Sequence, residues 1–163
     1  MEELKLVYAY DRQEEVGELF KEYTDMLIEG DKNFAEYLKI QKYDKELENP
    51  ASTYGMPEGR LYLAYYEDKL AGCIGLKKLD EEGQQCELKR LYVRPQFRGR
   101  KMGEKLLEVI LQDAKEIGYK AMLLDTLPFL KSAIKMYRKR GFYEIPCYND
   151  SPMDTTIFMK LDL

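Results

Sequence analysis

The sequence predicts an α+β domain with one mixed, mostly antiparallel sheet of six to seven strands and about four flanking helices. Short apolar runs separated by turn residues recur along the chain, and longer segments with helical periodicity lie between them. One run, Ala121–Asp125, is apolar without alternation, which is typical of a parallel strand inside a sheet. The length of 163 residues fits a single domain, expected to span residues 1–163.

The first sixty residues are predicted to hold one strand, two helices and a loop. Leu4–Tyr10 alternates weakly, as a strand does, whereas helical spacing of apolar residues predicts a helix over Glu14–Ile28. A second helix is expected from Asn33, a suitable N-cap, to about Tyr43. Residues 44–59 carry two prolines and two glycines with little periodicity, so they are expected to form a functional or mobile loop.

Three strands of an antiparallel meander are expected next. They cover Leu61–Tyr66, Leu70–Leu79 and Cys86–Val93, and short turns at Glu67–Lys69 and Asp80–Gln85 join them.

The C-terminal half is predicted to add two helices and a hairpin around the strand Ala121–Asp125. The strongest helical pattern covers Arg98–Ile117, and a second helix is expected over Leu130–Arg140. Phe142–Cys147 and Thr155–Leu161 are expected to pair as the closing hairpin.

Composition excludes several classes of function. The chain has no histidine, and its three cysteines are scattered without CxxC spacing, so no metal site, disulfide framework or histidine-based triad is expected. Proton transfer must then use Glu, Asp, Tyr, Lys, Cys or water. No apolar run approaches the roughly 20 residues that cross a bilayer, and the N-terminus lacks the layout of a signal peptide. A cytoplasmic protein without a membrane partner is therefore expected.

Charge is unevenly distributed along this chain of net charge −4. Residues 1–60 hold 15 acidic and 8 basic side chains, a balance of −7, whereas residues 89–105 hold 7 basic and 1 acidic, a balance of +6. A basic cluster on an acidic protein predicts a site for a compact anion. The competing interpretation is a nucleic-acid surface, although nucleic-acid-binding domains are usually basic overall.

The stretch LYVRPQFRGRKMGEKLL, residues 91–107, places a basic turn with glycines between a strand and a helix. Such a turn presents successive backbone N–H groups at a helix N-terminus, where anions are stabilised, and Gly99 and Gly103 allow close approach. Full positive charges come from Arg98, Arg100 and Lys101. We expect a pyrophosphate to bind here, although an ordinary capped helix would also produce this pattern. Neither GxGxxG nor the P-loop pattern is present.

Two segments resemble the GNAT superfamily of N-acetyltransferases. The family's acetyl-CoA motif matches at Gln96 and Gly99, and Ala133–Phe142 (AIKMYRKRGF) matches its A-x-x-x-Y-x-x-x-G-F element. Two departures stand out: Lys101 replaces a small residue of the motif, and Leu130 replaces an Asn that contacts the cofactor in many members.

The resemblance implies a sheet that splays at its two central parallel strands, with the pantetheine arm of acetyl-CoA in the gap. The strand backbone at Leu91 and Val93 would pair with the pantetheine amides, and the amides of residues 98–103 would hold the pyrophosphate. The residues expected to contact acetyl-CoA are Leu91, Tyr92, Val93, Gln96, Arg98, Gly99, Arg100, Lys101, Met102, Gly103, Glu104, Asp125, Thr126, Ala133 and Lys139.

Two catalytic residues follow from the same resemblance. Tyr137 matches the tyrosine that protonates the departing thiolate, although its apolar helix face would also suit a core tyrosine. Glu87 stands where some members place the general base, acting directly or through water, and a salt bridge to Lys89 or Arg90 is the alternative. Walls of the acceptor site, or ordinary packing residues, are Tyr23, Tyr54, Arg60 and Tyr148.

The resulting hypothesis is direct transfer of an acetyl group from acetyl-CoA to a primary amine of a small molecule or a protein. Transfer of a longer acyl group is the alternative within enzymes. An acyl-CoA-binding sensor without turnover and a nucleic-acid-binding module are the alternatives from other classes. The resemblance also allows a homodimer.

Overall fold

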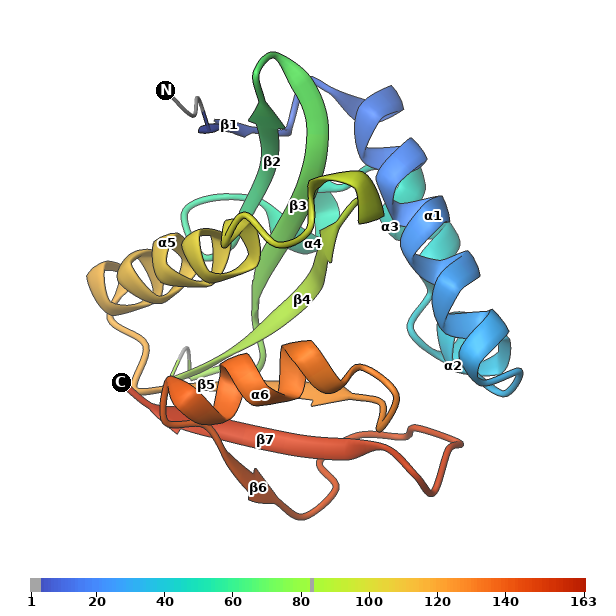
Figure 1. The fold of residues 1–163 in the computed structure, drawn as a ribbon. Coiled ribbons are helices and arrows are strands. Elements are labelled where there is room, and N and C mark those ends of the chain that lie inside the picture. The colour runs from blue at the N-terminus through green and yellow to red at the C-terminus, as the bar shows by residue number, and fades with distance from the viewer. Residues whose placement is uncertain (1–3, 83) are drawn as a thin grey trace.

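Seven strands form one sheet, in the order β1-β2-β3-β4-β5-β7-β6, in the computed structural model, which describes residues 4–82 and 84–163 (Figure 1). All neighbouring strands are antiparallel except β4 and β5, which are parallel. The strands are β1 Leu4–Tyr8, β2 Arg60–Tyr66, β3 Lys69–Lys78, β4 Gln85–Val93, β5 Ala121–Thr126, β6 Tyr143–Ile145 and β7 Ile157–Asp162. The predicted α+β fold with a mostly antiparallel sheet is confirmed.

Helices cover both faces of this sheet (Figure 1). They are α1 Gln13–Gly30, α2 Phe34–Ile40, α3 Tyr43–Glu48, α4 Ala51–Tyr54, α5 Met102–Ile117 and α6 Lys131–Lys139, with a 3-10 turn at Pro95–Phe97. Strand β2 shows the consequence of this layering: Leu61 and Leu63 pack with α1, while Tyr62 and Ala64 pack in the cluster that contains α5. Because successive strand residues point to opposite faces, both faces of β2 are buried.

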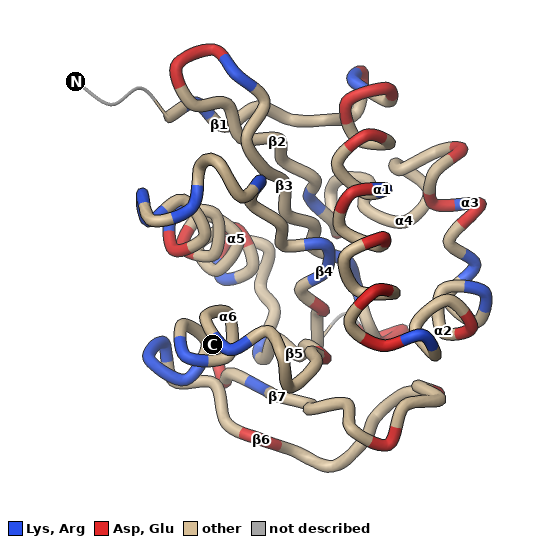
Figure 2. Tube along the Cα trace, turned by 45° about the vertical axis from the view of Figure 1, so that its right-hand side comes forward, with Lys and Arg blue, Asp and Glu red and all other residues tan. Residues whose placement is uncertain are grey.

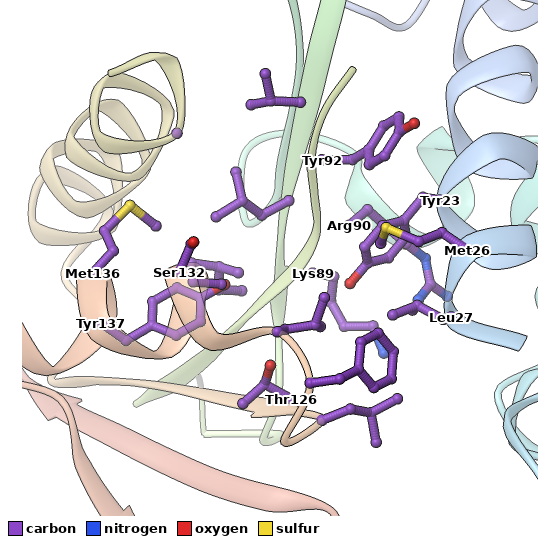
Figure 3. A pocket seen from close by; sticks show the side chains of 18 of the residues that line it. Tyr23, Met26, Leu27, Lys89, Arg90, Tyr92, Thr126, Ser132, Met136 and Tyr137 are labelled. Atoms are coloured by element: carbon purple, nitrogen blue, oxygen red, sulfur yellow. The ribbon is translucent and has the colours of Figure 1, made fainter. Parts of the chain in front are cut away.

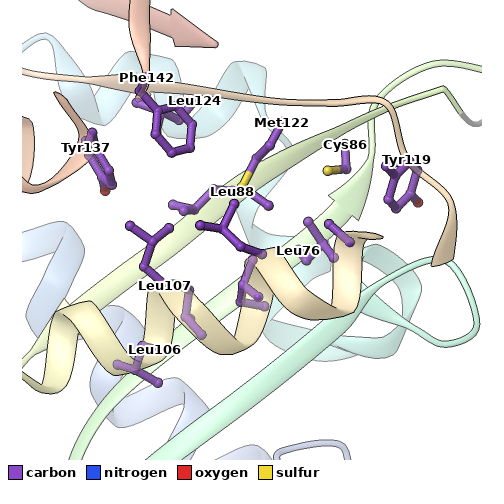
Figure 4. Close-up of a cluster of buried hydrophobic side chains, with 14 of the residues drawn as sticks. Leu76, Cys86, Leu88, Leu106, Leu107, Tyr119, Met122, Leu124, Tyr137 and Phe142 are labelled. Atoms are coloured by element: carbon purple, nitrogen blue, oxygen red, sulfur yellow. The ribbon is translucent and has the colours of Figure 1, made fainter. Parts of the chain in front are cut away.

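The main core lies between the sheet and α5 (Figure 4). Leu106, Leu107 and Ile110 of α5 are fully buried against Leu76 of β3 and Met122 of β5. Burial of a large aliphatic side chain contributes about 1.5–3 kcal/mol. This packing fixes the beginning of α5 relative to the central strands.

Strands β4 and β5 separate soon after they begin to pair. Their ladder covers Gln85, Cys86 and Glu87 opposite residues 121–123, whereas β4 continues to Val93. Beyond Glu87 the edge of β4 that faces β5 therefore has no partner strand, and the expected splay is present.

A β-bulge interrupts β4 inside the splayed region. Lys89 opposes Gly75 and Tyr92 opposes Cys73, so two residues of β4 lie opposite one residue of β3, and Arg90 has a φ of 59°. Leu88 and Leu91 both pack in the α5 cluster. The bulge consequently turns Lys89 and Arg90 toward the same face, the one covered by α1.

The prediction of a loop over residues 44–59 was wrong for part of that segment. It contains α3 and α4, and Pro50, the residue directly before α4, lies between them at a helix start, where proline is tolerated. Glu46 of α3 forms a buried ion pair with Arg90, and Tyr54 is fully buried. These tertiary contacts hold short helices that local periodicity does not indicate.

The helix predicted over Arg98–Ile117 begins later, at Met102. Gly99 has a φ of 83° and Lys101 a φ of 60°, so both residues adopt the left-handed conformation and the segment before Met102 is a turn. Residue 83, within the turn predicted at Asp80–Gln85, lies outside the described residues.

Candidate active site

A cavity of about 450 Å³ opens where β4 and β5 separate (Figure 3). Its walls come from α1, α2, β4, the turn before α5, β5 and α6. Apolar side chains form most of the lining, with a few polar groups between them, as is usual for a small-molecule site.

The turn before α5 exposes a row of backbone donors beside this cavity. No hydrogen bond from the N–H groups of residues 99–104 is present among the described residues, and the first helical bond is donated by Lys105 to the Lys101 carbonyl at 3.2 Å. Four unpaired N–H groups are normal at a helix N-terminus, and here the preceding turn adds two more. Such a group of donors suits an anion.

Gly103 is the residue of this turn where the absence of a side chain matters most for the lining of the cavity. Among the described residues, a Cβ placed there would meet only Met136, with 3.7 Å to its Sδ, so the surrounding protein has room for a side chain. A ligand approaching the amides would fill that room. The turn therefore fits the diphosphate of a nucleotide cofactor in both its donors and its space.

The exposed edge of β4 forms the next wall. Leu91 and Val93 line the cavity, and their strand edge lacks a partner because the ladder with β5 has ended. Arg98 Nε donates to the Val93 carbonyl at 3.1 Å, which leaves the remaining donors and acceptors of this edge available to an extended ligand.

Tyr137 of α6 reaches the opposite side of the cavity (Figure 3). Its ring packs on Phe142 with 5.6 Å between centroids, and no hydrogen bond of its hydroxyl is present among residues 4–82 and 84–163. Burial raises the pKa of Tyr137, and Tyr23 and Asp125 add to the increase. The hydroxyl is therefore protonated at neutral pH and available to donate into the cavity.

Glu87 lies beside the cavity and is absent from its lining. Tyr148 donates to Glu87 Oε2 at 2.6 Å, and Lys77 Nζ lies 3.9 Å from Oε1. Burial raises the pKa of Tyr148, and the Glu87 carboxylate adds to this effect. The partners of Glu87 are thus Tyr148 and Lys77, instead of the Lys89 or Arg90 named from the sequence.

Asp125 lines the cavity at the end of β5. Tyr37 of α2 donates a hydrogen bond to Asp125 Oδ2, and Asn149 donates to the same oxygen at 2.7 Å. These hydrogen bonds join α2, the end of β5 and the loop that contains Asn149 at one end of the cavity.

The basic cluster of residues 89–105 divides in space. Arg94 pairs with Glu18 and Glu22 of α1, and Arg90 pairs with Glu46, so these two charges are neutralised. Figure 2 shows the acidic residues spaced along α1 that make this possible. The exposed members of the cluster are Arg98, Arg100, Lys101 and Lys105.

The structure brings most of the predicted cofactor residues together. The cavity is lined by Leu91, Tyr92, Val93, Arg98, Gly99, Lys101, Met102, Gly103, Glu104, Asp125, Thr126 and Ala133. Gln96, Arg100 and Lys139 lie outside this lining, and Arg100 stacks on Tyr66 with 4.9 Å to the ring centroid.

Of the predicted acceptor residues, only Tyr23 lines the cavity. Tyr54 is buried against Phe20, and Arg60 Nε lies 3.7 Å from Asp113 Oδ2. Tyr148 is the partner of Glu87.

Sequence reasoning missed Lys89, Phe34 and Tyr37 as lining residues. One signal was available: two consecutive cations, Lys89 and Arg90, stand in an otherwise apolar strand, where regular alternation would place them on opposite faces. The contribution of α2 had no local signal, because it depends on how α2 packs against the C-terminal loop.

Comparisons with known proteins give one consistent result. The sequence model described as "Acetyltransferase (GNAT) family" matches residues 17–142. An uncharacterised N-acetyltransferase of Schizosaccharomyces pombe is 39% identical over 77% of each chain. Another, from Dictyostelium discoideum, is 31% identical over 98% of this chain and 99% of its own length.

Solved structures agree with this result. A GNAT acetyltransferase of Staphylococcus aureus has a TM-score of 0.74 at 26% identity, covering 98% of this chain and 99% of its own. One from Elizabethkingia anophelis, solved with acetyl-CoA bound, has a TM-score of 0.54 at 25% identity over 65% of this chain and 77% of its own.

In the described part of the chain, no helix combines the length and the apolar character that membrane spanning requires.

Proposed function

Because the chain belongs to the GNAT family of N-acetyltransferases, we propose that it transfers the acetyl group of acetyl-CoA to a primary amine bound beside β4. The amine belongs to a small molecule or to a protein. The observation that carries the proposal is the convergence on one cavity of the unpaired amides of residues 99–104, the free edge of β4 and the Tyr137 hydroxyl.

The chain holds acetyl-CoA with two sets of backbone groups in this proposal. The amides of residues 99–104 bind the diphosphate, with Arg98 and Lys101 adding charge at the cavity rim. The edge of β4 at Leu91 and Val93 binds the pantetheine arm as an added strand would. When bound, acetyl-CoA supplies a thioester that an amine can attack.

Tyr137 acts as the general acid. Its hydroxyl lines the cavity, and its raised pKa keeps it protonated at neutral pH. The thiolate of CoA forms in the same cavity, where loss of water destabilises its charge as well, so it takes a proton from the phenol although ordinary thiol and phenol pKa values are about 8.5 and 10. The neighbouring Phe142 fixes the ring orientation.

Glu87 is the base in this proposal and acts through a water molecule. A lysine-like amine with a pKa of about 10.4 pays about 4–5 kcal/mol to become neutral at pH 7, so a proton acceptor is needed. Glu87 contacts Tyr148 and lies outside the cavity lining, which is why its proton must arrive by relay. Asp125 is a second candidate because its carboxylate lines the cavity.

The test is release of free thiol from acetyl-CoA in the presence of a panel of primary amines, combined with thermal shifts on adding acetyl-CoA. We expect a clear thermal shift and amine-dependent thiol release. A shift without release from any amine would identify an acyl-CoA sensor, and no shift would contradict acetyl-CoA binding altogether. Longer acyl-CoA thioesters in the same assay measure the preference for acyl length.

A further inference from the structure

Lys89 is a buried lysine on the cavity side of β4. The bulge in β4 turns it to the face that α1 covers, together with Arg90. Its side chain is 8% exposed and lines the cavity, projecting between Leu27 of α1 and Thr126 of β5 (Figure 3).

The ammonium of Lys89 has no partner among residues 4–82 and 84–163, where no hydrogen bond or ion pair involves it. Its neighbour Arg90 is fully engaged: the guanidinium binds both carboxylate oxygens of Glu46 at 2.7 and 3.1 Å and donates to Gln41 at 2.8 Å. The bulge thus places two buried cations on one face, and Glu46 pairs with Arg90 alone.

The nearest carboxylates that face the same side are also engaged. Glu87 accepts a hydrogen bond from Tyr148, and Asp125 accepts hydrogen bonds from Tyr37 and Asn149. Neither lies within ion-pair distance of Lys89. These contacts keep both acids away from the lysine.

A buried cation without an ion-pair partner is unfavourable, because it has lost water and gained little in exchange. Burial lowers the pKa of Lys89 and the positive charge of Arg90 adds to this decrease, whereas the carboxylates of Glu87, Asp125 and Glu46, none of them within ion-pair distance, oppose it. An anion entering the cavity would offset the cost of burial and gain a charge-assisted hydrogen bond.

On the α1 side of Lys89, the cavity combines the Arg90–Gln41 pair with an apolar surface. Leu27, Phe34, Leu127 and Met153 form one buried cluster, and all four line the cavity. A molecule whose anionic group reaches Lys89 would therefore place an apolar portion against these side chains.

Before transfer, acetyl-CoA does not provide this anion, and the thiolate that forms during transfer takes its proton from Tyr137 in the proposed function. The charges of acetyl-CoA are phosphates, which the proposed function places at the turn after Val93, and the four residue steps from Lys89 to Val93 span up to about 13 Å of strand. The acetyl group is uncharged. The anion must come from the second substrate, or from an acyl group that carries its own carboxylate.

We propose that the amine acceptor carries a carboxylate, which Lys89 binds, and an apolar body that packs on Leu27, Phe34 and Met153; an apolar α-amino acid has this chemistry. The inference rests on the proposed function. Transfer forms a C–N bond to the amine and breaks the C–S bond of the thioester, so the products are an N-acetylated amino acid and free CoA. Lys89 takes no part in these bond changes and acts as a specificity residue.

The test compares three acceptors that share one apolar body: L-phenylalanine, phenylalaninamide and phenethylamine, each with acetyl-CoA. We expect wild-type kcat/KM to be at least tenfold higher for phenylalanine than for the two molecules that lack a carboxylate. L-leucine against isopentylamine repeats the comparison with an aliphatic body, and succinyl-CoA with phenethylamine tests a carboxylate on the acyl group instead. This comparison needs no variant.

Lys89→Met then tests the residue itself, with Lys69→Met, an exposed lysine of β3, as the matched control. Lys89→Met is expected to raise KM for phenylalanine about tenfold or more, the usual effect of losing one charged hydrogen bond, and to leave phenethylamine within about twofold. Thermal shift with CoA checks that the variant still folds and binds the cofactor.

Three results would overturn the inference and leave acetyl transfer intact. They are equal use of phenylalanine and phenethylamine, an equal effect of Lys89→Met on both, and a preference for succinyl-CoA that depends on Lys89. Failure of CoA to shift the melting temperature would instead contradict the proposed function. If CoA binds and none of these amines turns over, a Lys89-dependent shift with phenylalanine supports the inference and its absence refutes it.

Discussion

Tyr137 and Tyr148 are both buried tyrosines near the cavity, and their surroundings give them different roles. Tyr148 donates its hydroxyl hydrogen to Glu87, so its proton is already engaged. The Tyr137 hydroxyl lines the cavity, and no hydrogen bond involving it is present in the described part of the chain. Of these two tyrosines, Tyr137 is the one that can offer a proton to a ligand without first breaking a contact.

Tyr137→Phe tests this difference at a single atom. Loss of a general acid typically costs 10²–10⁴-fold, so we expect kcat to fall about 100-fold or more. The dissociation constant for CoA should stay within about twofold because the ring still packs on Phe142. Tyr143→Phe, an exposed tyrosine of β6, is the control. An unchanged kcat in steady-state thiol release would return Tyr137 to a packing role.

The turn before α5 shows how an element can present backbone donors beside a cavity. Left-handed residues at Gly99 and Lys101 break what the apolar periodicity presents as one helix, so the helix begins at Met102, and its first N–H groups donate no hydrogen bond within the described residues. The sequence located this turn correctly because glycine and proline constrain the backbone locally. It misplaced the helix start because periodicity continues across the turn.

Gly103→Ala separates binding from stability at this element. The new methyl would lie 3.7 Å from Met136 Sδ, an ordinary contact, and alanine favours helix over glycine by up to about 1 kcal/mol, so the fold should keep or gain stability. The same methyl would occupy the space beside the amides, and we expect CoA affinity to fall about tenfold or more, the usual effect of losing one hydrogen bond to a charged group.

Gly17→Ala in α1 is the matched control for this prediction. No atom lies within 4 Å of a Cβ placed there, so it should add stability and leave the CoA dissociation constant unchanged in calorimetric titration. If both variants bind CoA as wild type does, the diphosphate does not sit on this turn.

Helix α3 is held in place in part by a buried ion pair. Glu46 is 4% exposed and binds Arg90 through both oxygens, so removing it leaves a buried cation. We expect Glu46→Ala to lower the free energy of unfolding by about 3–5 kcal/mol. Glu48→Ala, in the exposed last turn of the same helix, should change it by less than about 0.5 kcal/mol. Urea unfolding curves that coincide for the two variants would contradict this role.

The same helix shows where prediction from sequence ends. Helices α1, α5 and α6 have strong periodicity, and the strands are short apolar or alternating runs between turn residues, so these elements could be predicted from their own residues. Helix α3 and the cavity residues Phe34 and Tyr37 owe their places to partners far along the chain, such as Arg90 and Asp125. The motifs predicted most of the lining that the proposal assigns to the cofactor, whereas the lining that it assigns to the acceptor depends on the tertiary arrangement.

At the scale of the whole molecule, acidic side chains of the helices pair with two arginines in and directly after β4. The acidic residues of α1 neutralise Arg94, and α3 neutralises Arg90, so the positive charge left near the cavity belongs to the turn before α5, to Lys89 and to Lys131 of α6 (Figure 2). The interior also holds many tyrosines: burial raises the pKa of Tyr119 to about 12 and raises those of Tyr23 and Tyr54 as well.

This tyrosine-rich interior predicts alkaline sensitivity. Above pH 10 the unfolded chain loses tyrosine protons that the folded chain retains, so the unfolded state binds fewer protons and stability falls as pH rises. Each such tyrosine contributes about 1.4 kcal/mol per pH unit until its folded pKa is reached. Lys89 has a lowered pKa, so below about pH 10.5 it makes stability rise with pH instead of fall. This is one group acting against several tyrosines. Urea unfolding at pH 9, 10 and 11 should show a steep decline, and a flat profile would contradict the burial of these hydroxyls.

A crystal structure of the protein with CoA tests the proposed binding site most directly. We expect the diphosphate oxygens within hydrogen-bond distance of the amides of residues 99–104, and the pantetheine arm along β4 between Glu87 and Val93. A diphosphate bound elsewhere, with these amides facing water or protein, would contradict the site on which the proposed reaction depends.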